Sequence, residues 1–172
     1  MTDDEATVPD GISIESAVSD DRLDVLRVLD AAMLETDSEL VTERIDAGDA
    51  LVARFRRTGA VVGALVATRP DPRRLHVDAV AVRRARRGRG IGSALVAAAV
   101  RRAERDVAVD AVTAAFDSKL EAFYTDLGFQ IDRNRCGGDR GVGESEADRV
   151  RGRRPVDAPM GDDDPESGER RR

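Results

Sequence analysis

The feature that most constrains the fold is a short arginine- and glycine-rich stretch that joins an apolar strand pattern to a helical one. Residues 82–95 read VRRARRGRGIGSAL, with glycine at positions 88, 90 and 92. Glycine lacks a Cβ, so the backbone there can curl and approach a ligand closely. The helix expected from Gly90 or Ile91 onward adds unpaired amides and the positive end of its dipole. This order of elements predicts a phosphate-binding loop, with the amides of residues 88–93 converging on phosphate oxygens.

The spacing of the glycines narrows the choice of phosphate ligand. The dinucleotide-binding pattern G-x-G-x-x-G is not completed, because its last position falls on Ser93 or Leu95. A P-loop requires a lysine followed by Ser or Thr after its last glycine, and the only lysine of the chain, Lys119, lies well downstream. The pattern that remains is R-x-x-G-x-G over residues 87–92.

An alternative interpretation of the same stretch is a solvated turn or a nucleic-acid patch, because five arginines lie between residues 83 and 89. Two observations weigh against it. The glycines are regularly placed between a strand and a helix, and the loop has no aromatic residue that could stack on bases. The formal net charge of the chain is −6, which disfavours general binding to nucleic acid. We therefore expect no nucleic-acid partner, and the arginine patch remains the less favoured alternative.

Composition predicts a single domain. A chain of 172 residues suits one ordinary core, and no apolar run approaches the length of a membrane span. Residues 1–10 are acidic and lack the basic and apolar regions of a signal peptide, which predicts a cytoplasmic protein without a membrane partner. The single cysteine, Cys136, rules out an internal disulfide. Aspartate is abundant, nearly all positive charge is arginine, and only 3% of residues are aromatic, which resembles proteins of halophilic archaea.

The apolar pattern predicts alternating strands and helices up to residue 132. We expect strands over residues 12–17, 50–55, 61–68, 75–82, 111–116 and 129–132, and helices from about 20 to 33 and over 38–47, 91–105 and 118–127. No Ile, Leu or Phe follows Ile131. We therefore expect a disordered leader over 1–10, an ordered domain over 11–132, and a low-complexity tail over 133–172 that is largely disordered, with a weak strand near 149–156. The tail is either a natural extension or the product of a shifted reading frame.

A second motif lies downstream of the loop. Residues 117–129 read DSKLEAFYTDLGF, in which Tyr124 precedes the pair Gly128-Phe129. Together with R-x-x-G-x-G, this segment resembles the GNAT superfamily of N-acetyltransferases, and the resemblance covers about residues 12–132. Asp117 stands where the family prefers Asn, and Leu120 where it prefers Ala. The resemblance implies a mixed α/β fold, with a mostly antiparallel sheet, helices on both faces, and acyl-CoA in a splay between the fourth and fifth strands, here residues 75–82 and 111–116.

The resemblance also implies a reaction and a set of site residues. It implies direct transfer of an acetyl group from acetyl-CoA to a primary amine, on a small metabolite or a protein, without a metal. Tyr124 would be the general acid that serves the departing thiolate, although a packed aromatic is the structural alternative. The residues that would bind the co-substrate are Val80, Ala81, Val82, Arg87, Gly88, Arg89, Gly90, Ile91, Gly92, Ser93 and Asp117.

The amine must lose a proton before it can attack, because an ammonium has no lone pair. By strand alternation, His76 and Asp78 should share a face with Val80 and Val82, so both are candidate bases. A hydrogen-bonded structural role is the alternative for His76. Further candidates are Glu35, Glu39 and solvent. An acyl-CoA-binding module without turnover remains an alternative function, and an exposed last strand could pair two copies as a homodimer.

Overall fold

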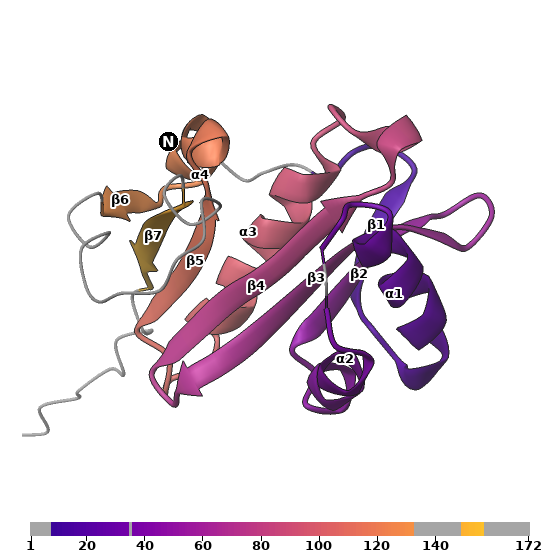
Figure 1. Cartoon of the computed structure of the whole chain (residues 1–172). Helices are drawn as coiled ribbons and strands as arrows, with labels where there is room; N and C mark the ends of the chain where they lie inside the picture. Colours follow the sequence, from indigo (N-terminus) through magenta and orange to yellow (C-terminus); the bar gives the residue numbers. More distant parts are fainter. Residues whose placement is uncertain (1–7, 35, 133–148, 157–172) are drawn as a thin grey trace, which may run out of the picture.

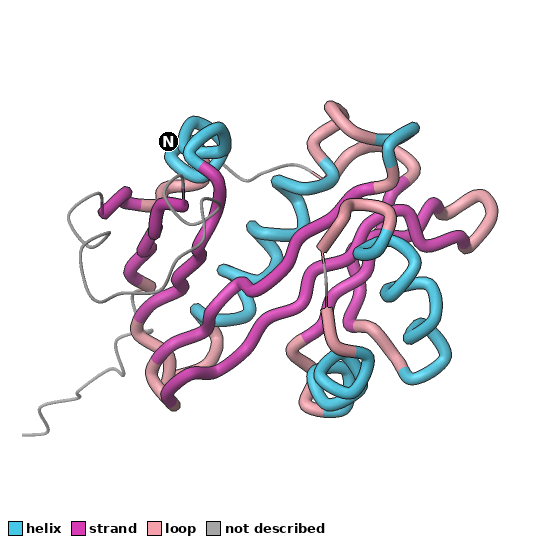
Figure 2. Tube along the Cα trace, viewed as in Figure 1, coloured by secondary structure: helices cyan, strands magenta, loops and turns pink. Residues whose placement is uncertain are grey.

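The computed structural model describes residues 8–34, 36–132 and 149–156. Figures 1 and 2 show strands and helices that alternate along the chain, with one sheet at the centre. The strands are β1 (Ile12–Ser16), β2 (Ala50–Phe55), β3 (Ala60–Asp71), β4 (Arg74–Val82), β5 (Ala111–Asp117), β6 (Gln130–Asp132) and β7 (Arg149–Pro155). The helices are α1 (Arg22–Asp30), α2 (Ser38–Asp46), α3 (Ile91–Glu104) and α4 (Glu121–Asp126), with 3₁₀ turns at Ser19–Asp21, Arg84–Arg86 and Ser118–Leu120.

The strands form one seven-stranded sheet in the order β1-β2-β3-β4-β5-β7-β6. Every neighbouring pair is antiparallel except β4 and β5, which are parallel. Helices cover both faces, since α3 packs on one side and α1 and α2 pack on the other. The fold class expected from the sequence is therefore confirmed. No helix in the described part of the chain is long and apolar enough to cross a membrane.

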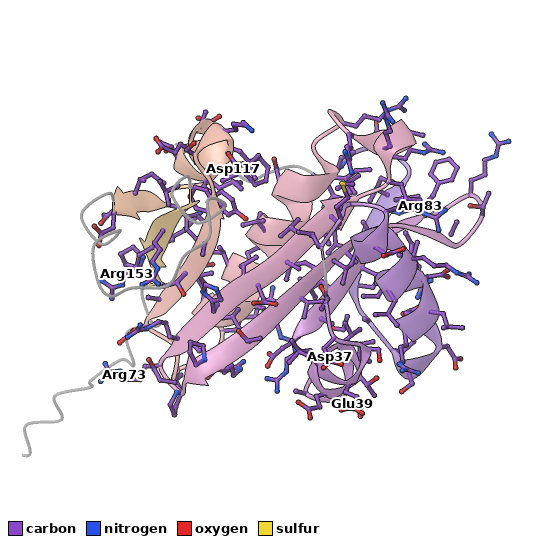
Figure 3. The ribbon with its side chains drawn as sticks, viewed as in Figure 1. Asp37, Glu39, Arg73, Arg83, Asp117 and Arg153 are labelled. Carbon is purple, nitrogen blue, oxygen red and sulfur yellow. The ribbon has the colours of Figure 1, made fainter. Side chains whose placement is uncertain are left out.

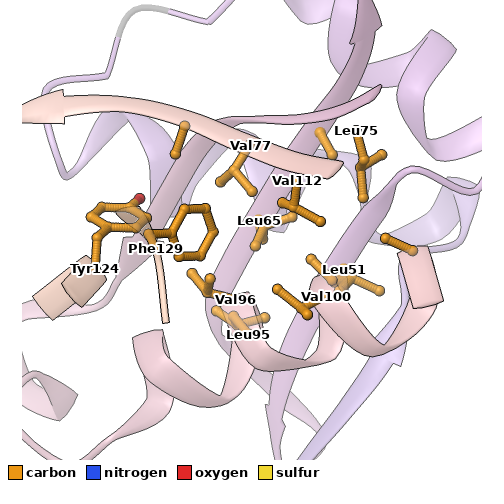
Figure 4. Packing of buried hydrophobic residues seen from close by; sticks show 14 of the residues in the cluster. Leu51, Leu65, Leu75, Val77, Leu95, Val96, Val100, Val112, Tyr124 and Phe129 are labelled. Atoms are coloured by element: carbon orange, nitrogen blue, oxygen red, sulfur yellow. The ribbon is translucent and has the colours of Figure 1, made fainter. Parts of the chain in front are cut away.

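Two apolar cores lie on opposite faces of the sheet. The larger one joins α3 to the strands and includes Leu95, Val112 and Tyr124 (Figure 4). The smaller one joins α1 and α2 to β2, β3 and β4. The helix α3 comes very close to β3 at Gly63, where a Cβ would meet Ile91 Cγ2 and Leu95 Cδ1 at 3.2 Å. The missing side chain thus lets the first turns of α3 seat directly on the sheet.

A β-bulge interrupts β4 at Asp78. Val66 of β3 pairs with Ala79, but the next residue, Ala67, pairs with Val77, which leaves Asp78 as an extra residue. Val77 therefore belongs to the core under α3, whereas Ala79 belongs to the core under α1 and α2. An inserted residue reverses which face of the sheet the even-numbered and odd-numbered side chains occupy, when the strand before the insertion is compared with the strand after it.

The expectation that His76, Asp78, Val80 and Val82 share one face is therefore wrong. Val80 and Val82 pack against the α3 core, on the same side as Val77, so His76 lies on the opposite face. The expectation rested on uninterrupted period-two alternation, which the bulge breaks between His76 and Val80.

The strands β4 and β5 separate just beyond the same point. Their pairing runs from Arg74↔Ala111 to Val77↔Ala114, yet β4 continues to Val82 and β5 to Asp117. The C-terminal halves of these two parallel strands therefore leave a gap in the sheet.

The strand β7 lies inside the sheet. All seven of its residues pair with β5, and three of them also pair with β6. Gly152 fits beneath two aromatic rings, since a Cβ there would come within 3.0 Å of Phe116 Cε1 and 3.3 Å of Phe129 Cδ1. The sheet thus extends past residue 132, the expected end of the ordered domain, through a strand at the place where only a weak one was expected, near 149–156. The remaining leader and tail residues, 1–7, 133–148 and 157–172, lie outside the described residues.

Candidate functional site

A cleft of about 720 Å³ opens where β4 and β5 separate. Its walls come from the end of β4, the glycine loop, the first turn of α3, the end of β5 and α4. The connection between α1 and α2 closes one side through Leu34. The residues predicted for the donor site that line this cleft are Val80, Val82, Arg87, Gly88, Gly90, Ile91, Gly92, Ser93 and Asp117. Two others do not line it, since Arg89 is exposed elsewhere and Ala81 packs in the core under α1 and α2.

The edge of β4 presents backbone groups to the cleft. The amide of Arg83 donates to the carbonyl of Val62 on β3 at 2.8 Å, so alternate residues of β4 back from Arg83 also bond to β3. Val80 and Val82 occupy the intervening positions, and their N–H and C=O groups point the other way, into the gap left by β5. The carbonyl of Val82 accepts a bond from Arg87 Nε at 2.9 Å. The Val80 amide is thus directed at the cleft.

The loop after β4 has the geometry of an anion site. Gly88 and Gly90 adopt left-handed backbone conformations, with φ of +71° and +78°. Gly90 caps the 14-residue helix α3, so the free amides of the first helical turn face the cleft beside the loop. An anion placed there would meet several amides and the positive end of the helix dipole.

Two of the loop arginines make contacts with other parts of the fold. Arg86 lies over the ring of Phe55, with its guanidinium carbon 4.2 Å from the ring centre, and Arg87 is tied to β4. Arg83 is exposed and projects beside this end of the sheet (Figure 3). Contacts within the fold thus hold two of the five loop arginines, Arg86 and Arg87.

Tyr124 lies at the opposite side of the cleft, on α4. Its ring is 5% exposed and stacks on Phe116 with the ring centres 3.8 Å apart, while Phe123 and Phe129 meet it edge-on at 5.0 and 5.2 Å. Burial raises the pKa of Tyr124 to about 12, because the charged tyrosinate loses its hydration. The hydroxyl accepts and donates no hydrogen bond within the described ranges. It therefore stays protonated at neutral pH and can donate to a group in the cleft.

Asp117 supports the local backbone beside the cleft (Figure 3). Its Oδ1 accepts a hydrogen bond from the amide of Lys119 at 2.9 Å and caps the 3₁₀ turn that leads into α4. The amide oxygen of an asparagine could accept the same bond. The replacement of the residue preferred by the resembled family thus preserves the cap that orients Tyr124.

The candidate bases do not all gather at the cleft. Asp78 lines it and is exposed, because the bulge turns this residue out of the sheet. His76 does not line it, and its Nδ1 lies 2.9 Å from Thr113 Oγ1 on the neighbouring strand. Glu39 lies in the first turn of α2, away from the cleft (Figure 3), and Glu35 lies outside the described residues.

Several lining residues escaped the sequence analysis. Leu34 lies in a connection without periodicity, and nothing in its surroundings points to a role. Leu120 and Phe123 lie within the predicted motif around Tyr124, so their proximity to that residue was the available signal. No three His, Cys, Asp or Glu side chains come together as a metal site in the part of the chain that the structure describes.

The mixed sheet and its covering helices form a fold that this chain shares with solved acetyltransferase structures. Residues 20–129, more than half of the chain, match the family described as the Acetyltransferase (GNAT) family. The chain therefore belongs to the GNAT acetyltransferases. Among curated proteins, no sequence matches this chain.

Solved structures share this fold at low sequence identity. The NAA60 protein of Arabidopsis thaliana, in complex with a bisubstrate analogue, aligns at a TM-score of 0.71 and 15% identity over 86% of this chain and 99% of its own. The putative acetyltransferase yncA from Salmonella typhimurium, solved with acetyl-CoA, aligns at a TM-score of 0.68 and 18% identity, over 90% of this chain and 99% of its own. Ard1 from Thermoplasma volcanium aligns at a TM-score of 0.67 and 19% identity, over 85% of this chain and 98% of its own.

The raised pKa of Tyr124 can be measured directly, because the chain contains one tyrosine and no tryptophan. We expect the tyrosinate absorbance of the folded protein to develop around pH 12, and that of the protein unfolded in denaturant around pH 10. A folded pKa above the unfolded value means that this contribution to stability is present below pH 10 and is lost as pH rises toward 12. Absorbance after a rapid pH jump, with circular dichroism to verify folding, makes the measurement. A folded-state midpoint near 10 would contradict the buried position of the ring.

Proposed function

We propose that this protein transfers the acetyl group of acetyl-CoA to a primary amine by direct attack. The observation that carries the proposal is the convergence on one cleft of the Val80 amide, the glycine loop and the Tyr124 hydroxyl. The proposal assigns the cytoplasm as the compartment, and the Asp-rich, Lys-poor composition favours a halophilic source, so assays belong in high potassium chloride as well as in dilute buffer.

The loop and α3 would hold the pyrophosphate of the donor. Close amides would do most of this work, because at molar salt the Debye length is only about 3 Å and distant arginines are screened. The pantetheine arm would then follow the gap between β4 and β5, where the backbone of Val80 and Val82 is turned toward it.

The chemical step needs two proton movements. The nitrogen lone pair of the neutral amine attacks the thioester carbonyl carbon, whose oxygen accepts a hydrogen bond from the Val80 amide. The carbon–sulfur bond breaks, and the sulfur takes the proton of the Tyr124 hydroxyl. The proton of the attacking amine passes to Asp78 directly or through water, and thence to solvent. Tyrosinate then recovers its proton from solvent, which a pKa of about 12 favours strongly.

The loop assignment is tested by Gly90→Ala. A side chain at φ of +78° costs about 1–2 kcal/mol, so the backbone should relax and displace the cradle amides. We expect acetyl-CoA to bind about tenfold more weakly. Binding of S-acetylpantetheine, which has no pyrophosphate, should not change. Gly59→Ala is the matched control, because Gly59 has a φ of +71° in an exposed turn with no atom within 4 Å of its Cβ. Equal weakening of both ligands would sink the pyrophosphate assignment.

The proton donor is tested by Tyr124→Phe, which keeps the stacking on Phe116 and removes only the hydroxyl. We expect kcat to fall about a hundredfold in a thiol-release assay over a panel of amines, since general acid catalysis contributes about that much. Acetyl-CoA affinity, measured by calorimetry, should stay constant. Full turnover by the variant would show that the thiolate leaves without Tyr124. Saturable acetyl-CoA binding by the native protein without turnover of any amine would instead favour an acyl-CoA-binding module.

The proton acceptor is tested by Asp78→Asn, which keeps the size of the side chain. Without this carboxylate the proton of the attacking amine must pass to bulk base, which is scarce near neutrality. We expect kcat/KM to fall about tenfold at pH 7 and to recover at high pH, where hydroxide can take that proton. A pH-rate profile against a single amine makes the comparison. A parallel loss at every pH would indicate that Asp78 only binds the acceptor.

A further inference from the structure

Among the described residues, no helix covers one face of the sheet beside the cleft. The helices α1 and α2 pack on β2, β3 and β4 and stand to one side of β5, β7 and β6 (Figure 1). On this face Thr113 and Ala115 of β5 are only half-buried, and Arg151 and Arg153 of β7 are exposed. On the opposite face, by contrast, Val112 and Ala114 are fully buried under α3.

The register places the two arginines next to the cleft. Arg151 pairs with Ala115 and Arg153 pairs with Thr113. Ala115 itself lines the cleft, so Arg151 lies one strand spacing, about 4.8 Å, from its wall. Residues two apart on a strand share a face at about 6.7 Å, and Val150, buried among the core residues, shows that the odd-numbered residues face outward. Figure 3 shows Arg153 on this outer part of the sheet.

The charges of these arginines are not used within the described part of the fold. Neither Arg151 nor Arg153 forms an ion pair or a side-chain hydrogen bond with another described residue. Their neighbour Arg154, which faces the other way, is occupied with the carbonyl of Leu127 and with Glu104 Oε1. Many other arginines of the sheet are paired too, for example Arg54 with Asp21 and Glu15. Two available cations beside an acetyl-transfer cleft suit an anionic portion of the acceptor.

We propose that Arg151 and Arg153 bind a carboxylate of the acceptor, so that the preferred substrate is an amine that also carries negative charge. This inference rests on the proposed acetyltransferase function. The amine would lie at the cleft mouth near Asp78, and its carboxylate would reach across Ala115 to the guanidinium groups, which bind carboxylates with paired N–H donors. The carboxylate could belong to a small acidic amino acid or to the side chains of an acidic peptide.

Two matched pairs of acceptors test the inference and distinguish these sources. The α-amide of glutamate is compared with the α-amide of glutamine, and the peptide Ala-Glu-Glu with Ala-Gln-Gln, the peptides being amidated at the C-terminus, so that the members of each pair differ only in side-chain carboxylates. We expect the acidic member of at least one pair to have a kcat/KM about tenfold higher, mainly through a lower KM. The double variant Arg151→Glu/Arg153→Glu should remove or invert that preference and leave the affinity for acetyl-CoA unchanged. Arg151→Lys/Arg153→Lys should restore it in part, because charge returns without the paired geometry.

Arg56→Glu/Arg57→Glu is the control for net charge, since it changes the charge by the same amount and both arginines are exposed in the turn between β2 and β3 and line no part of the cleft. It should keep the acidic preference. A preference confined to one pair identifies the source of the carboxylate. Equal turnover of both members in both pairs overturns the inference and leaves the acetyltransferase function intact, as does a preference that survives Arg151→Glu/Arg153→Glu. Absence of turnover with every amine overturns the proposed function and this inference with it.

Discussion

The site depends on the loss of pairing between β4 and β5. Hydrogen bonds that would continue the parallel ladder stop after Val77 and Ala114, and the next residue of β4, Asp78, is the extra residue that interrupts its ladder to β3. Unpaired buried backbone groups are costly, so a gap inside a sheet persists only where a ligand or solvent satisfies them. The bulge also sets the direction of each group beyond it. With one residue fewer, the polar groups of Val80 and Val82 would point toward β3, and those of the neighbouring residues would face the cleft in their place.

The close packing of α3 on the sheet fixes the position of this helix relative to the gap between β4 and β5. Gly63 lets Ile91 and Leu95 approach β3, which anchors the first turns of the helix. The left-handed conformation at Gly90 then turns the chain abruptly from the loop into the helix, so the free amides stand beside the end of β4. Loop geometry and core packing therefore act together, because a helix free to slide would carry its amides away from the gap.

Much of the site could be predicted from the sequence, because its residues lie in two short segments with strong local signals. The glycines that end β4 and begin α3, and the motif around Tyr124, have the required spacing in the chain itself. The bulge had no such signal. Between Leu75 and Val82 the only polar residues are His76 and Asp78, and every other residue is apolar. Both faces of this strand are covered by core. The sequence therefore has the same apolar pattern whether or not the strand contains an extra residue. The misplacement of His76 follows from this ambiguity.

The strand β7 shows a different limit of sequence patterns. Four of its seven residues are arginine, which is typical of a solvated segment rather than of an internal strand. Its place in the sheet depends on long-range pairing with β5 and on the absence of a side chain at Gly152, beneath Phe116 and Phe129. Only one face of the strand meets the core, so Val150 and Gly152 suffice to seat it. No helix of the described ranges covers the other face, and arginine is tolerated there because the guanidinium groups of Arg151 and Arg153 are exposed. A strand that looks unsuited to a sheet is thus compatible with one whose outer face stays open.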